Sequence, residues 1–167
     1  MQRRLHLRHV RFWILIFIAG LVISGVTAFP LRMEVDWLSA MLHSPRLLPL
    51  ATATHLLPWI TRVDEALALT AAQYPFLAYG TDWLAYGHLV IAVAFIGVYR
   101  DPERNQWLLT FGLIACAGVI PLALIAGHFR GIPLGWRLID CCFGVFGAIP
   151  LLLAQRSLQK FRNSPVD

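Results

Sequence analysis

The sequence predicts an all-α integral membrane protein, a four-helix bundle that occupies residues 1–167 as a single membrane domain. Composition is the first observation behind this prediction. Apolar residues make up 58% of the chain and charged residues only 14%, and the mean hydropathy of +0.65 is far from the balance of a soluble protein. The second observation is that the apolar residues gather in four runs of spanning length: 12–29, 83–99, 107–126 and 134–154.

The first run, residues 12–29, follows a start that holds four arginines within residues 1–11. At about 1.5 Å per residue the run covers roughly 27 Å, close to the hydrocarbon thickness of a bilayer. It is longer than the core of a typical cleavable signal peptide, and Pro30-Leu-Arg-Met offers no small-x-small cleavage site. We therefore expect a retained first transmembrane helix.

The later runs are joined by short polar or glycine-rich connections. Between the second and third runs, Asp101 is expected to cap the third helix and Pro102 to occupy its first helical position. Between the third and fourth runs, residues 127–133 combine two glycines and a proline, which end one helix and begin the next. The second and third helices are therefore expected to be antiparallel neighbours.

Small residues and prolines inside the runs predict how the helices pack. Small residues four apart let helices approach closely, and two such pairs occur, Gly20 with Ser24 and Gly144 with Ala148. Pro121 and Pro150 are expected to kink the third and fourth helices or to free a backbone carbonyl there.

The segment 30–81, between the first and second runs, is too long for a turn and too apolar for a disordered linker. An amphipathic helix is predicted near its start, because four apolar side chains fall at helical spacing: Leu31, Val35, Leu38 and Leu42. A second helix is predicted over residues 62–73, with two acidic residues in its first turn. The apolar stretch between them carries Pro49 and Pro58, which argues against a full crossing. We expect this segment to lie at the outer interface as an extracytoplasmic amphipathic helical lid.

The distribution of positive charge predicts the orientation. The net charge is +5, yet the basic residues lie in short clusters beside apolar runs, so nucleic acid is not an expected partner. Nine of the fourteen basic residues fall on one side of the four-span scheme: Arg3, Arg4, Arg8, Arg11, Arg100, Arg104, Arg156, Lys160 and Arg162. By the positive-inside rule, both the N-terminus and the C-terminus are expected to be cytoplasmic in a multi-pass protein of the cell inner membrane.

The strongest candidate for a functional site is the pair Arg137 and Asp140, at the start of the fourth run. Three residues apart on a helix, they share one face and can form an ion pair. In one interpretation the pair only sets the depth of the helix. In the other, Asp140 binds a cation, a proton or a polar headgroup, because ionisable residues inside a span tend to mark function. The sequence leaves both open.

Four further polar residues are expected near the same outer depth, Asp82, His88, His128 and Arg130, and with Arg137 and Asp140 they are the candidate catalytic residues. Their convergence under the lid depends on helix rotations that the sequence does not specify. His88 and His128 are also candidate haem ligands, because histidines on neighbouring helices with apolar, aromatic surroundings suit a b-type haem. No C-x-x-C-H haem attachment sequence is present, so this stays a minority interpretation.

Other metal or catalytic chemistry has weaker support. His43 and His55 match no standard ligand spacing, and no metal site is predicted. The three cysteines, Cys116, Cys141 and Cys142, lie in apolar runs and are expected to be packing residues. The sequence contains no G-x-S-x-G, H-E-x-x-H, phosphate-loop or G-x-G-x-x-G motif.

Two stretches, residues 76–105 and 130–151, resemble small uncharacterised bacterial inner-membrane proteins with four predicted spans. The resemblance covers the C-terminal half best. It implies a bacterial inner-membrane setting and no particular activity, cofactor or partner.

Together these observations favour a small polytopic inner-membrane protein that acts as an accessory or sensing component through partner contacts. The expected partners are the lipid bilayer and another membrane protein or a second copy of the chain. The alternative is a membrane enzyme, or a haem- or quinone-binding redox subunit, with an outer-leaflet polar site on the last three helices. A transporter or channel is weaker, because four helices leave little room for a pore. The sequence does not decide whether the protein is an enzyme or which cofactor it holds.

Overall fold

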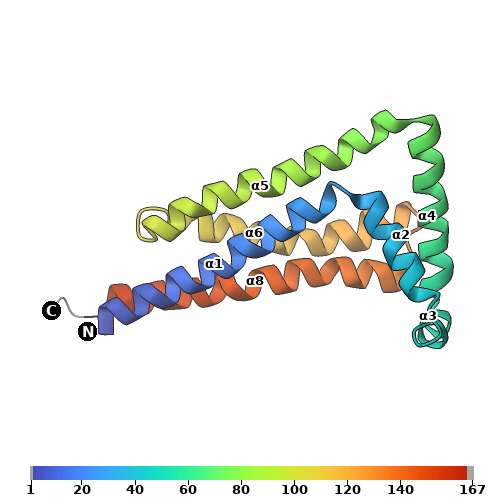
Figure 1. The fold of residues 1–167 in the computed structure, drawn as a ribbon. Helices are drawn as coiled ribbons and strands as arrows, with labels where there is room; N and C mark the ends of the chain where they lie inside the picture. The colour runs from blue at the N-terminus through green and yellow to red at the C-terminus, as the bar shows by residue number, and fades with distance from the viewer. Residues whose placement is uncertain (1, 165–167) are drawn as a thin grey trace. The chain divides into compact units, whose positions relative to one another are not determined.

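Helices form nearly the whole of the computed structural model, which describes residues 2–164 (Figure 1). No strand occurs among these residues, so the all-α prediction is confirmed. Four helical segments are long and apolar enough to cross a membrane: Gln2–Ala28, Pro75–Arg100, Gln106–Phe129 and Leu134–Asn163. The last three contain the predicted runs 83–99, 107–126 and 134–154, and the first contains the predicted run 12–29 except for its last residue.

The chain divides into two compact units. The described residues of unit 1 are 2–22 and 90–164, and unit 2 consists of residues 23–89. Helices α1 (Gln2–Ala28) and α5 (Tyr79–Arg100) contribute residues to both.

Unit 1 contains the first part of α1, the second part of α5, and the helices that follow. These are α6 (Gln106–Pro121), the π-helical turn η2 (Leu122–Ala126), the short α7 (Gly127–Phe129) and α8 (Leu134–Asn163). Their shared core includes side chains of 0% exposure from four helices: Ile14, Phe95, Leu109 and Leu151. The rings of Phe17 and Phe95 meet within it, with centroids 4.6 Å apart.

The close contact of α6 with α8 depends on glycine. A Cβ added at Gly144 would collide with the backbone carbonyl oxygen of Cys116 and would lie 3.2 Å from the Cβ of Val119. The predicted role of Gly144 in helix packing is therefore confirmed. Gly20 differs, because a Cβ added there would meet no atom within 4 Å.

Helix boundaries in unit 1 differ from the sequence prediction at three places. The first and last helices extend beyond their apolar runs, to Gln2 and Asn163, because arginine and lysine are good helix formers outside the lipid as well. The prediction that Asp101 and Pro102 begin the third helix is wrong, since α6 begins at Gln106. Residues 101–105 form a turn instead.

That turn is closed by polar side chains. The Asp101 side chain accepts a hydrogen bond from the backbone N–H of Arg104 at 3.1 Å. The Asn105 amide donates to the carbonyls of Gly97 and Asp101, at 3.1 and 2.9 Å. Asn105 thereby satisfies carbonyl groups at and just after the end of α5, and the helical hydrogen bonding of α6 begins only after Asn105.

Unit 2 contains α2 (Leu31–Leu42), α3 (Leu48–Ala53), α4 (Leu56–Gln73) and the 3₁₀ turn η1 (Pro75–Ala78), together with the adjoining parts of α1 and α5. Both predicted helices of segment 30–81 are present, although α4 begins at Leu56 and not at residue 62. The reason is that Pro58 lies in the first turn of α4 and Pro49 in the first turn of α3, where a missing N–H costs nothing.

Helix α2 packs against α4 and is amphipathic, as its spacing predicts. Leu42 is buried, and Leu31, Val35 and Leu38 are half-buried. The face away from this stripe carries charged residues, but it also carries Met33 and Trp37, each 71% exposed. Large apolar side chains are thus exposed on a helix that is not itself of spanning length.

Candidate functional site

The polar residues of the candidate site in unit 1 lie on η2, α7, the turn after α7, and the first turns of α8. Pro121 has no N–H to offer the carbonyl four residues before it, and the π-helical turn η2 follows directly. A π turn inserts one extra residue into the helix, so the backbone bonding pattern is locally changed. This irregular backbone faces α8, which η2 contacts.

Arg137 of α8 reaches across to this irregular backbone. Its Nη1 donates a hydrogen bond to the carbonyl oxygen of Leu124 at 3.0 Å. Its aliphatic stem packs on Gly127, where an added Cβ would lie 2.7 Å from the Cδ of Arg137. One turn further along α8, the Cys141 thiol lies 4.0 Å from the Ile120 carbonyl oxygen. Arg137 and Cys141, one turn apart on α8, therefore contact the carbonyls of Leu124 and Ile120, which are also four residues apart.

The predicted ion pair between Arg137 and Asp140 does not form among the described residues. The guanidinium Nη1 bonds Leu124, and its buried Nε has no partner there. The physical reason is geometric: the stem of Arg137 is held against Gly127, which directs the guanidinium toward η2. Asp140 is half-buried, and helical spacing places it on the same side of α8 as Gly144 and Gly147.

His128 and Arg130 lie at the end of α7 and are both exposed. The turn after α7 holds them there, because Gly131 adopts a φ of +68° and its N–H donates to the His128 carbonyl at 3.1 Å. The ring of His128 stacks edge-on against Phe129, with centroids 5.7 Å apart. Unit 1 thus contains four of the six candidate residues.

Asp82 and His88, the other two candidates, lie on the part of α5 that belongs to unit 2. Both are half-buried. His88 Nδ1 lies 2.8 Å from the Leu84 carbonyl oxygen of its own helix, an arrangement that leaves Nε2 available to another group. Convergence of all six residues, and haem ligation by His88 and His128, stay predictions. Within residues 2–164, no cluster of three or more metal-ligating side chains occurs.

Unit 2 contains an acidic contact that sequence reasoning did not single out. Asp36 of α2 shares a hydrogen bond with Asp64 of α4, and this bond raises the pKa of Asp36 above its ordinary value of 3.8. Partial loss of water and the negative charge of Asp64 act in the same direction, and Arg32 opposes them. The sequence shows both carboxylates on predicted helices, but it does not show that these two helices pack together.

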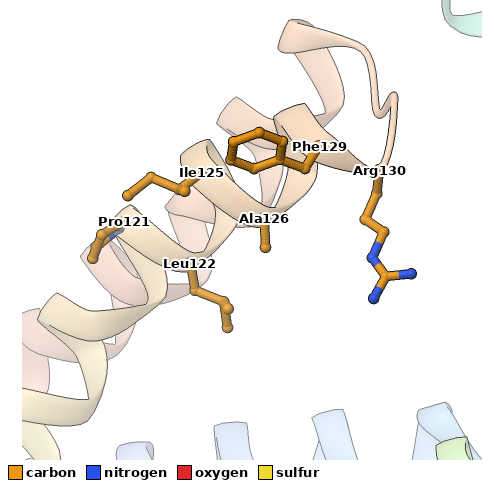
Figure 2. Close-up of a pocket in the computed structure, with 6 residues that line it drawn as sticks. All are labelled: Pro121, Leu122, Ile125, Ala126, Phe129 and Arg130. Atoms are coloured by element: carbon orange, nitrogen blue, oxygen red, sulfur yellow. The ribbon is translucent and has the colours of Figure 1, made fainter.

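Unit 1 also carries an apolar hollow of about 570 Å³ along the outer side of η2 and α7. Figure 2 shows its lining as two ridges, Pro121, Ile125 and Phe129 on one and Leu122, Ala126 and Arg130 on the other. We call it the η2 groove. Sequence reasoning missed it, although two apolar rows at four-residue spacing, with the small Ala126 between larger neighbours, were visible.

The opposite end of unit 1 gathers the predicted cytoplasmic basic residues. Arg11 Nε donates to the Tyr99 carbonyl at 3.2 Å, the guanidinium of Arg3 lies 4.5 Å from the ring centre of Phe161, and Arg162 Nη1 donates to Gln106 Oε1 at 2.8 Å. The start of α1, the 101–105 turn and the end of α8 therefore lie together, as Figure 1 also shows.

These features define a class: a small all-α protein with four helices long and apolar enough to cross a membrane. Comparison with protein families, with curated proteins and with solved structures finds no match for the chain.

Proposed function

We propose that this chain is a four-span integral protein of a bacterial inner membrane, with both termini cytoplasmic, and that it acts as an accessory or sensing component through contacts with another membrane protein or with itself. One observation carries the membrane assignment: four helices of spanning length whose outward surfaces are rich in exposed apolar side chains. Ile23, Val93, Ile114 and Phe146 are examples, one from each helix, with exposures of 64, 66, 68 and 67%. Exposed faces of this kind are stable in lipid and unstable in water.

The orientation is supported by the basic end of unit 1. Nine basic residues lie in the first part of α1, in or beside the 101–105 turn, and in the last part of α8. Contacts from Arg3, Arg11 and Arg162 hold these segments at one end of the unit. Positive charge concentrated at one end of a helix bundle stays on the cytoplasmic side during insertion. In this orientation the segment 30–81 is extracytoplasmic.

Helices α2 to α4 fit a location at the outer membrane surface. Each is too short or too polar to count among the spanning helices. Exposed aromatic residues nonetheless surround them: Trp37, Tyr74, Phe76, Tyr79 and Trp83. Tryptophan and tyrosine concentrate at the level of lipid headgroups, where an apolar ring and a polar tip are both satisfied. This is the arrangement of the proposed lid.

The accessory role is inferred from the use that unit 1 makes of its polar residues. Arg137 fixes α8 to η2 through Leu124 and packs on Gly127, which is a structural task. The contact supports the structural interpretation of Arg137 over one in which it tunes Asp140. A chain of this size without a recognised catalytic motif acts most simply through its surfaces.

Membrane insertion and orientation can be tested together. Alkaline carbonate should leave the protein in the membrane pellet. In a variant without native cysteines, a membrane-impermeant maleimide should label Thr54→Cys in intact cells and should label Glu103→Cys only after permeabilisation. Both positions are exposed, which makes them a matched pair. Release by carbonate would refute the membrane assignment, and reversed labelling would refute the orientation.

The accessory role requires a separate test. Crosslinking in membranes followed by affinity purification should recover one membrane partner or a second copy of the chain in stoichiometric amount. A visible spectrum of the purified protein, before and after dithionite, checks the alternative. A stoichiometric haem band that is lost in His88→Ala would contradict the accessory role and favour the redox subunit.

A further inference from the structure

We propose that the η2 groove binds one anionic phospholipid, with an acyl chain between its two ridges and Arg130 at the headgroup. This inference rests on the proposed membrane insertion, because the groove lies on a helical segment of spanning length, Gln106–Phe129. It goes further by naming a site and the class of its ligand.

The shape of the groove suits an acyl chain. Five of its six lining residues are apolar, and the ridges are formed by Pro121, Ile125 and Phe129 and by Leu122, Ala126 and Arg130 (Figure 2). Ala126 has the smallest side chain of the six residues that line this space of about 570 Å³. From residue 122 to residue 130 a continuous α-helix would rise roughly 12 Å, which is an upper bound here because Leu122–Ala126 forms a π turn, and half the hydrocarbon thickness of a bilayer is about 15 Å. The groove therefore fits within one leaflet.

The side chains of the groove are exposed within the structure. Phe129 is 83% exposed, Leu122 66% and Ile125 59%. The hollow between large apolar groups is too apolar to hold ordered water well, because water there would have few polar partners. A flexible hydrocarbon chain fills such a space at no polar cost.

The positive charge of Arg130 favours an anionic headgroup. Arg130 is the charged member of the lining, it is exposed, and it forms no ion pair among the described residues. Figure 2 shows its side chain extending past the end of the helix, beyond Ala126. Guanidinium binds phosphate through paired N–H groups, so a headgroup with net negative charge is favoured over a zwitterionic one.

The test compares phosphatidylglycerol with phosphatidylcholine by native mass spectrometry of the purified full-length protein. The wild type should retain one phosphatidylglycerol with clear preference over phosphatidylcholine. Arg130→Gln, which keeps a polar side chain but shortens it and removes the charge, should reduce that preference roughly fivefold, the effect of one basic residue at a lipid surface. Arg104→Gln, an exposed position in the 101–105 turn, is the matched control and should leave the preference unchanged.

A second variant tests the groove itself. Ala126→Phe fills the space between the ridges and should displace the bound lipid while the helical circular dichroism stays that of the wild type. Equal retention of both lipids by the wild type, an unchanged preference in Arg130→Gln, or an equal loss in Arg104→Gln would each overturn the proposal. A protein that resists carbonate extraction and still fails this test refutes the lipid site alone. A protein that carbonate releases refutes the proposed membrane insertion.

Discussion

The contact of α6 with α8 at Gly144 allows a sharp test by a single methyl group. In Gly144→Ala, the new Cβ would collide with the backbone carbonyl oxygen of Cys116 and lie 3.2 Å from the Cβ of Val119. Neither atom is the far end of a flexible side chain. The two helices would therefore have to move apart to admit the methyl group, and the packing around Gly144 would loosen with them.

The matched control is Gly118→Ala on α6. Gly118 is exposed, and a Cβ added there meets no atom within 4 Å. Both substitutions gain the same helix propensity, up to about 1 kcal/mol. Only Gly144→Ala adds overpacking, which costs about 1–3 kcal/mol. The difference between the two variants isolates the close contact, so Gly144→Ala should unfold with a free energy about 1–3 kcal/mol below that of Gly118→Ala.

The assay is reversible unfolding in mixed micelles by increasing dodecyl sulfate, followed by circular dichroism. The free energy of unfolding is compared between the two variants and the wild type. Equal stability of the two variants, or a more stable Gly144→Ala, would refute the close approach of α6 and α8. A large loss in Gly118→Ala would show that the faces of α6 are assigned wrongly.

Three further predictions use the same protein. Gly112→Ala should cost less than Gly144→Ala in the same titration, because its Cβ would meet the ends of two side chains, Leu151 and Phe95, and not a backbone atom, and an equal cost would contradict this. Arg137→Met removes the donor to Leu124 and should lower the free energy of unfolding by about 1–3 kcal/mol, whereas no change would show that this bond contributes nothing. The raised pKa of Asp36 means that the folded protein binds this proton more tightly than the unfolded chain, so the stabilisation is present below pH 3.8 and is lost as the pH rises through the raised value. The denaturation temperature of the wild type should therefore fall relative to that of Asp36→Asn between about pH 3 and about pH 7, and parallel profiles would refute the acidic contact.

The helical fold could be predicted from the sequence because apolar runs of spanning length are long, strong signals. The ends of the helices could not, since hydropathy marks where lipid-compatible residues stop and not where backbone hydrogen bonds stop. Asp101 and Pro102 have the residue types of a helix start. In the structure, Asn105 bonds the carbonyls at the end of α5 and delays α6 to Gln106. Both Asp101 and Asn105 have residue types that favour a helix end, and which of them precedes α6 depends on side-chain geometry that the sequence does not contain.

The sequence predicted that Arg137 and Asp140 share one helix, but it did not predict the hydrogen bond that Arg137 forms. The spacing of Arg137 and Asp140 indicates one helix face, and spacing alone favours an ion pair. The acceptor that Arg137 uses is a backbone carbonyl of η2, which becomes accessible through a local change of helix type. Pro121 marked the neighbourhood of that change, because it removes a backbone donor, but it did not specify which carbonyl would be bonded.

The π turn η2 also sets the helical phase of everything that follows it. An α-helix rotates about 100° per residue, and a π turn takes up one more residue than an α-helical turn, so the later side chains lie about 100° from where a continuous α-helix of the same length would place them. If Leu122–Ala126 formed an ordinary α-helical turn of the same length, Phe129 and Arg130 would be turned by about 100° away from the side that holds Pro121. The helix type of this one turn therefore decides which way the end of the third spanning helix faces.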